Sequence, residues 1–139
     1  MSFREKSAWT TFVLLLAFGV YFLELAKPLI APQAPHPSYF PLFVGLVAAI
    51  VVVEIVMHVV LAIRAPQDAK APRDERERLI AQRATARAYY WLLPGAFAAI
   101  GTIHLGASTP VLAHCVLFAI WVAELTRYGS LLYYYRYGV

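Results

Sequence analysis

Two glutamates stand inside long apolar stretches of this sequence, where an ionisable side chain has the greatest potential for chemistry. Glu54 lies ten residues before Arg64, about 15 Å along a helix. Glu124 lies fourteen residues after Pro110. Within a bilayer a carboxylate costs about 2.5–3.5 kcal/mol on insertion scales, so it faces neighbouring helices, takes up a proton or forms an ion pair. Both glutamates are therefore candidate functional residues.

Each glutamate has candidate partners on its own helix face. His58 follows Glu54 by four residues, and Arg127 and Tyr128 follow Glu124 by three and four, spacings that place side chains on one side of a helix. A glutamate and a histidine in an apolar environment can share or pass a proton, because burial disfavours the charged form of both. Two interpretations stay open for these residues: a proton-responsive or ion-translocating centre, or a polar cluster that holds two helices in register.

The apolar composition indicates that much of the chain lies in a membrane. Of 139 residues, 61% are hydrophobic and 14% charged, against about 45–50% and about 25% in soluble domains, and the mean hydropathy is +0.63. A soluble protein of this size has too much surface to cover with such a composition, and the apolar excess excludes disorder. The single cysteine, Cys115, excludes a disulfide scaffold. We therefore expect an integral membrane protein.

Charge-free runs locate four expected membrane helices. Residues 7–23, 28–53 and 88–123 contain no Asp, Glu, Lys or Arg, and the last run is long enough for two spans of about 20 residues. Backbone groups in lipid must be paired internally, which requires helices. The sequence predicts one all-α, polytopic domain over residues 1–139, with four transmembrane helices at about 7–25, 39–63, 88–105 and 110–135.

Basic residues predict the orientation in the membrane. Seven of the twelve lie between the second and third expected helices: Arg64, Lys70, Arg73, Arg76, Arg78, Arg83 and Arg87. Others precede the first helix and follow the fourth. The positive-inside rule then predicts a multi-pass protein of the cell (inner) membrane, with both termini and the central segment in the cytoplasm. This topology accounts for the pI of about 9.4 without direct nucleic-acid binding.

Residues 64–87 are expected to form a cytoplasmic loop with an amphipathic helix. Asp74 is an expected N-cap, with Glu77 at capping-box spacing. An apolar stripe can follow, and the helix either lies at the inner membrane surface or continues into the third span. A solvated helix start that only determines topology is one interpretation. The other is docking of a soluble partner through the charged residues Asp74, Glu75, Arg76, Glu77, Arg78, Arg83 and Arg87.

Metal binding and enzymatic chemistry have little support. His104 and His114 flank the outer turn and are weak candidates for metal ligands, but a stable site needs three or four ligands. Neither a phosphate-binding loop, a dinucleotide-binding fingerprint, a nucleophile elbow nor a zinc-protease motif occurs. We therefore expect neither an enzyme nor a bound cofactor.

Two stretches resemble a known group of proteins. The first is Asp74-Glu75-Arg76-Glu77-Arg78-Leu79-Ile80, followed by Arg83-Ala84 and Tyr89-Tyr90, and the second is Glu124…Arg127-Tyr128-Gly129 with Leu131-Leu132-Tyr133-Tyr134-Tyr135-Arg136. They resemble parts of small four-helix membrane proteins of bacteria and archaea, a family of unknown function with a D-E-R motif in the central cytoplasmic segment. The resemblance implies four helices with both ends inside. It also implies that a small helix-turn-helix regulator pairs with the protein at the cytoplasmic segment.

Three functions are consistent with these patterns. The first is a regulatory or scaffolding membrane protein that holds a cytoplasmic partner through the basic central segment. The second is a small proton-coupled transporter or channel that uses Glu54 and Glu124, and the third is an accessory subunit of a larger membrane complex. Besides the lipid bilayer, the expected partners are a soluble cytoplasmic regulator, further copies of the chain or a larger membrane complex.

Overall fold

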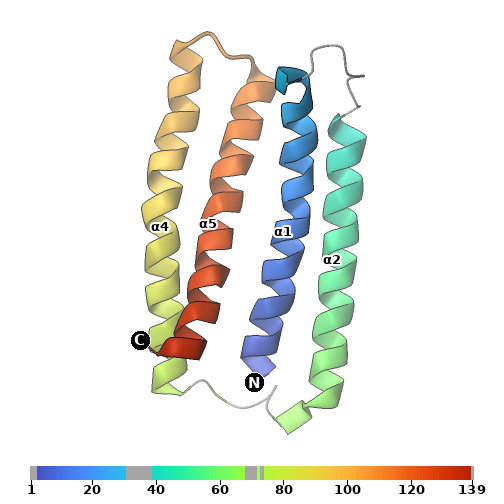
Figure 1. The fold of residues 1–139 in the computed structure, drawn as a ribbon, viewed down its shortest axis with the longest axis vertical. Helices are drawn as coiled ribbons and strands as arrows, with labels where there is room; N and C mark the ends of the chain where they lie inside the picture. The colour runs from blue at the N-terminus through green and yellow to red at the C-terminus, as the bar shows by residue number, and fades with distance from the viewer. Residues whose placement is uncertain (1–2, 31–38, 68–71, 73, 139) are drawn as a thin grey trace. The chain divides into compact units, whose positions relative to one another are not determined.

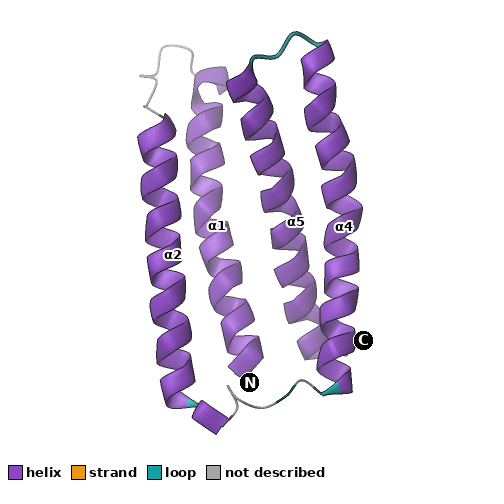
Figure 2. Ribbon diagram, turned by 180° about the vertical axis from the view of Figure 1, so that it is seen from behind, coloured by secondary structure: helices purple, strands orange, loops and turns teal. Residues whose placement is uncertain are grey.

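The protein is built from long helices. A computed structural model describes residues 3–30, 39–67, 72 and 74–138. These described residues contain no strand and, apart from short connections, are helical. The long helices are α1 (Phe3–Ile30), α2 (Tyr39–Arg64), α4 (Glu75–His104) and α5 (Thr109–Tyr137) (Figures 1 and 2). The all-α prediction is confirmed, while Lys70 and Arg73 of the central segment lie outside the described residues.

The helix bounds differ most from expectation at α4. Its first helical residue is Glu75, so the amphipathic segment and the third expected helix are one continuous helix of 30 residues. Asp74 is the N-cap, and its side chain accepts a hydrogen bond of 2.6 Å from the Glu77 backbone N–H. The only proline inside this helix is Pro94. Because nothing in between interrupts the backbone hydrogen bonds, the turn that Asp74 starts continues into the apolar segment.

Three of the described helices are long and apolar enough to cross a membrane. The candidate spans are Phe3–Lys27, Pro41–Arg64 and Thr109–Tyr137, in α1, α2 and α5. α4 does not meet this criterion over the described residues. Its first turns are charged, and the apolar part that follows begins with aromatic residues and ends at His104. The fourth spanning helix and the orientation in the membrane stay predictions.

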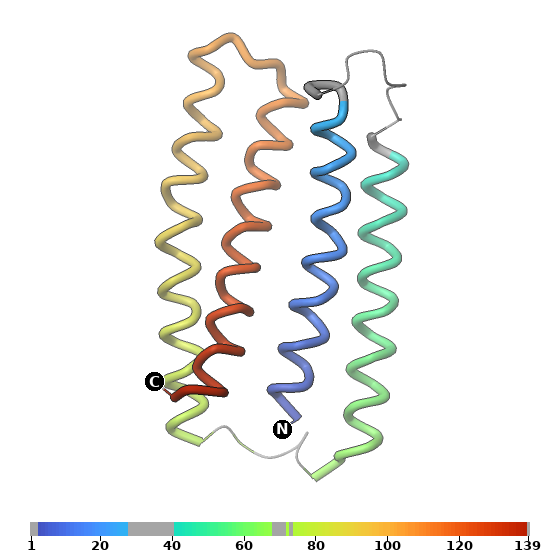
Figure 3. Tube along the Cα trace, in the orientation of Figure 1, coloured from blue at the N-terminus to red at the C-terminus, as the bar shows by residue number. Residues whose placement is uncertain are grey.

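The contacts divide the chain into two units, Met1–Lys70 and Ala71–Val139. Each unit is an antiparallel helical hairpin, formed by α1 and α2 in the first and by α4 and α5 in the second (Figure 3). The single domain expected over the whole chain stays a prediction.

Aromatic packing closes one end of the first hairpin. Phe18 and Tyr21 are buried, with Tyr21 only 2% exposed. Phe43 of α2 lies against both rings, with centroid distances of 6.3 Å to Phe18 and 5.7 Å to Tyr21. These are ordinary distances for tilted and edge-to-face aromatic pairs. The cluster therefore joins α1 to α2 near the end where the chain passes from one helix to the next.

Small residues bring the helices of the second hairpin together. A Cβ atom added to Gly95 of α4 would lie 2.8 Å from the Cβ atom of Ala119 on α5, and Ala99 and Ala123 are also buried. Close backbone approach at glycine and alanine is typical of helix pairs in membranes. Gly106, with φ of 76°, ends α4 in a Schellman turn.

Candidate functional site

The intramembrane candidates on α2 are bonded to α1. Thr11 Oγ1 donates a hydrogen bond of 2.9 Å to Glu54 Oε1. Ser7 Oγ lies 2.6 Å from His58 Nε2, and His58 Nδ1 lies 2.8 Å from the Glu54 main-chain oxygen. Four polar side chains from two helices thus form one network, which we call the hairpin network (Ser7, Thr11, Glu54 and His58). The His58 ring is hydrogen-bonded to the main-chain oxygen of Glu54, and the Glu54 carboxylate accepts its hydrogen bond from Thr11.

The partners of His58 define its tautomer. A carbonyl oxygen only accepts, so Nδ1 carries the hydrogen that is donated to the Glu54 main-chain oxygen. In the neutral ring, Nε2 then accepts from the Ser7 hydroxyl. The two contacts fix the orientation of the imidazole ring between α1 and α2.

Ser7 and Thr11 were not expected from the sequence. Their spacing of four residues matches the spacing of Glu54 and His58, and in an antiparallel pair a step of four along α1 meets a step of four back along α2. Matched polar pairs at this spacing are a signal that sequence reasoning can use, once the two helices are known to be neighbours. The register itself depends on the aromatic cluster at the other end of the hairpin.

The register also changes the expected depth of Glu54. Counted along α2, Glu54 lies about 15 Å from Arg64. Its partner Thr11, however, lies only five residues after Lys6, about 7.5 Å along α1. The hairpin network therefore lies closer to the basic end of this hairpin than the count along α2 alone suggests.

The second group of polar candidates lies entirely on α5. Arg127 Nη1 lies 3.3 Å from Glu124 Oε2, with side chains 39% and 41% exposed. The Arg127 guanidinium also lies 5.4 Å from the centroid of the Tyr128 ring. Glu124 and its partners thus form a local cluster on one helix of the second hairpin. Its union with Glu54 and His58 into one intramembrane centre stays a prediction.

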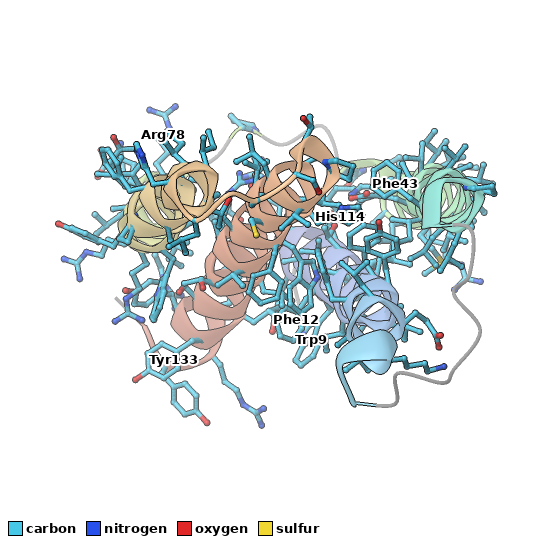
Figure 4. The ribbon with its side chains drawn as sticks, turned by 90° about the horizontal axis from the view of Figure 1, so that it is seen from above. Trp9, Phe12, Phe43, Arg78, His114 and Tyr133 are labelled. Atoms are coloured by element: carbon cyan, nitrogen blue, oxygen red, sulfur yellow. The ribbon has the colours of Figure 1, made fainter. Side chains whose placement is uncertain are left out.

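The predicted docking residues lie on what we call the charged arm, residues 74–87. Its apolar face is buried in the hairpin: Ile80 and Ala84 are 1% and 0% exposed, and Ala88, one turn after Ala84 and just beyond the arm, is 8% exposed. The docking residues lie elsewhere on the helix surface: Glu77 is half-buried, and the others, Asp74, Glu75, Arg76, Arg78, Arg83 and Arg87, are exposed. Arg78 projects away from the hairpin (Figure 4). The charged arm is therefore a helix that packs against α5.

The histidines beside the turn at Gly106 make separate contacts. His104 is exposed at the end of α4, and His114 Nδ1 lies 2.6 Å from the main-chain oxygen of Pro110. Over the described ranges, no group of three or more His, Cys, Asp or Glu side chains is placed to hold a metal ion. Neither histidine therefore gains further ligands from described neighbours.

The described residues define an all-helical protein with three helices able to cross a membrane. No protein-family model, curated protein or solved structure matches the chain.

Replacing Thr11 by valine tests the hairpin network. Valine keeps the shape of threonine and removes the hydroxyl that bonds Glu54. We expect the first hairpin to lose about 0.6–1.7 kcal/mol of stability, measured by denaturant unfolding in detergent micelles. Thr10→Val is the matched control, since Thr10 Oγ1 donates only to the Lys6 main-chain oxygen of its own helix. Equal losses in both variants would contradict a role of the Thr11–Glu54 bond between helices.

Proposed function

We propose that the protein is a non-enzymatic regulatory or scaffolding protein of the cell (inner) membrane that holds a cytoplasmic partner on its charged arm. In this proposal all four helices span the bilayer, and both termini and the charged arm lie in the cytoplasm. The observation that carries the proposal is the continuity of α4. The charged arm and the apolar segment are one helix, and α5 packs along it.

A helix that already packs against its neighbour binds a partner at a lower entropic cost than a loop does. A loop must lose conformational entropy when it binds, which reduces affinity, whereas the backbone of the charged arm is already ordered. Its apolar face is buried, so a partner meets charged side chains. Acidic residues lie in the first turn, and Arg83 and Arg87 lie further along. A partner recognised by this charge pattern is expected to dissociate as salt is raised.

Capture from native membranes in mild detergent tests the proposal. We expect a cytoplasmic protein to co-purify with the wild type. Its recovered amount is expected to fall about tenfold or more when Arg76, Arg78, Arg83 and Arg87 are all replaced by glutamine, since the loss of complementary charge slows association and weakens recognition of the partner. Arg127→Gln is the control, because it removes an arginine of the same hairpin outside the charged arm. If the quadruple variant inserts normally and retains the same cytoplasmic protein, docking on the charged arm is wrong.

An accessory subunit of a membrane complex is the second candidate. Gly45 on α2 and Gly101 on α4 would have no atom within 4 Å of an added Cβ, and much of α2 exposes large apolar side chains. Open glycines on apolar helices favour close packing of a further membrane helix. The same capture experiment separates the two candidates. An integral membrane protein that co-purifies with both the wild type and the quadruple arginine variant supports the accessory subunit.

Proton-coupled transport, the second function expected from the sequence, remains a hypothesis. It requires Glu54 and Glu124 to act along one route, whereas their described contacts lie in separate hairpins. Each glutamate carboxylate has a polar partner within its own hairpin, Thr11 for Glu54 and Arg127 for Glu124. The proposal above therefore does not rely on transport.

A further inference from the structure

Two neighbouring arginines of the charged arm have an unusual electrostatic environment. Arg83 and Arg87 are both exposed and lie one turn apart on α4, so their side chains share a flank of the helix. The positions three and four residues before and after each hold no carboxylate. Like charges at this spacing destabilise a helix. The pair therefore concentrates positive charge that its own helix does not compensate.

Other arginines of the same hairpin differ from this pair. Arg78 follows Asp74 and Glu75 by four and three residues, the spacing and order at which a carboxylate stabilises an arginine on a helix. Arg127 contacts Glu124 at 3.3 Å. Arg76, in the first turn, also lacks a carboxylate at these spacings, but Arg83 and Arg87 are the two such arginines of the charged arm that lie one turn apart and next to the apolar part of α4.

The position of the pair along α4 matches a layer of lipid headgroups. The charge-free part of the helix begins at Ala88, directly after Arg87. Arg83 lies about 6 Å further out, and a headgroup layer is about 5–8 Å thick on each side of the bilayer. Arg78 lies about 14 Å beyond Arg87 along the helix, outside that layer. Only the inner two arginines of the charged arm are within reach of phosphates.

An aromatic ring of α5 restrains Arg87, the inner arginine of the pair. The Arg87 guanidinium lies 5.0 Å from the centroid of the Tyr134 ring on α5, a cation–π contact that restricts the side chain. Tyr90, three residues after Arg87, is 77% exposed, and exposed tyrosines are typical of the membrane interface. An arginine held on a ring retains donors for a phosphate oxygen.

We propose that Arg83 and Arg87 form a binding site for the phosphodiester headgroup of an anionic phospholipid in the cytoplasmic leaflet. The bound phosphate lies between two guanidinium groups and offsets their repulsion, while Tyr134 orients Arg87. This proposal rests on the membrane topology of the proposed function but does not depend on a protein partner. The lipid leaves the outer residues Asp74, Glu75, Arg76 and Arg78 to that partner, and the two ligands compete only at Arg83 and Arg87.

Lipid retention by the full chain tests the proposal. The protein is reconstituted in nanodiscs of equal phosphatidylcholine and phosphatidylglycerol, released, and examined by native mass spectrometry for bound lipid. We expect the wild type to retain phosphatidylglycerol preferentially. In Arg83→Gln/Arg87→Gln the ratio of bound phosphatidylglycerol to bound phosphatidylcholine is expected to fall by about tenfold or more. Arg78→Gln is the matched control and is expected to retain it. Arg83→Lys/Arg87→Lys keeps the charge and is expected to show an intermediate preference.

The outcomes separate this proposal from docking of a protein. The lipid site is wrong if Arg83→Gln/Arg87→Gln retains phosphatidylglycerol as well as the wild type does. It is also wrong if Arg78→Gln loses as much phosphatidylglycerol as the double glutamine variant. Displacement of the lipid by millimolar inorganic phosphate also overturns it, in favour of a free-anion site. Circular dichroism and gel filtration in detergent confirm that the variants are folded. If the wild type captures no protein partner yet retains phosphatidylglycerol, the docking function fails and the lipid site stands.

Discussion

Replacing Ile80 by alanine is expected to destabilise the second hairpin by about 2–5 kcal/mol. Ile80 is 1% exposed and is the largest fully buried side chain among the described residues. It lies on the charged arm, which is too polar to lie among lipid chains, so its burial removes apolar surface from water and gains the full hydrophobic effect. The cavity left by alanine adds to the loss because α4 and α5 cannot fully close it.

Leu79→Ala provides the control for this prediction. Leu79 is adjacent in sequence and similar in size but 41% exposed, so its truncation is expected to cost less than about 1 kcal/mol. Both variants are compared by thermal unfolding in detergent, with circular dichroism as the signal that monitors the loss of helix. Comparable losses would show that the apolar stripe of the charged arm is not packed against α5. They would favour the alternative in which this stripe lies on the membrane surface.

Replacing Gly95 by alanine is expected to cost about 1–3 kcal/mol of hairpin stability. The new methyl group would lie 2.8 Å from the Cβ atom and 3.5 Å from the Cα atom of Ala119. The overlap is with the Cβ atom, since 3.5 Å to the Cα atom is an ordinary contact distance. The Cβ atom of an alanine is fixed by its backbone, so no side-chain rotation relieves the overlap and the helices must separate. The clash outweighs the gain in helix propensity of about 1 kcal/mol that alanine brings over glycine.

Gly101→Ala is the matched control for Gly95→Ala. Gly101 lies on the same helix and has nothing within 4 Å of an added Cβ, so this variant gains helix propensity without a clash. Ala119→Gly in the Gly95→Ala background moves the missing methyl group across the interface and is expected to restore part of the stability. Unfolding in detergent of the wild type, Gly95→Ala, Ala119→Gly and the double variant completes one double-mutant cycle, and Gly101→Ala is measured beside it. Equal stabilities of Gly95→Ala and Gly101→Ala would contradict close packing at Ala119.

Local features of the sequence predicted much of the fold. Apolar runs indicated helices, and the second expected helix, 39–63, differs from α2, Tyr39–Arg64, by one residue. Its end is well marked because Arg64 closes an apolar run. Asp74 was recognised as an N-cap because its hydrogen bond reaches a residue only three positions away. Such features depend on neighbours in the chain and can be read without a three-dimensional structure.

The continuity of α4 required more than local features. A charged helix of about thirteen residues is marginal alone, so the sequence left two placements open for the charged arm. Burial of Ile80 and Ala84 in the hairpin stabilises the continuous helix. The decisive contribution comes from α5, whose contacting end is distant in sequence: Tyr134 packs on Arg87.

The sequence by itself determined that this chain forms long apolar helices, where they are placed in the chain, and that Glu54 and His58 lie on one face of α2. Only the tertiary structure decided which side chains on other helices meet them: Ser7 and Thr11 bond to Glu54 and His58, and Gly95 faces Ala119. The physical reason is that helix formation follows from residues a few positions apart, whereas contacts between helices depend on register. Register is set by packing between side chains distant in sequence, such as Tyr21 and Phe43.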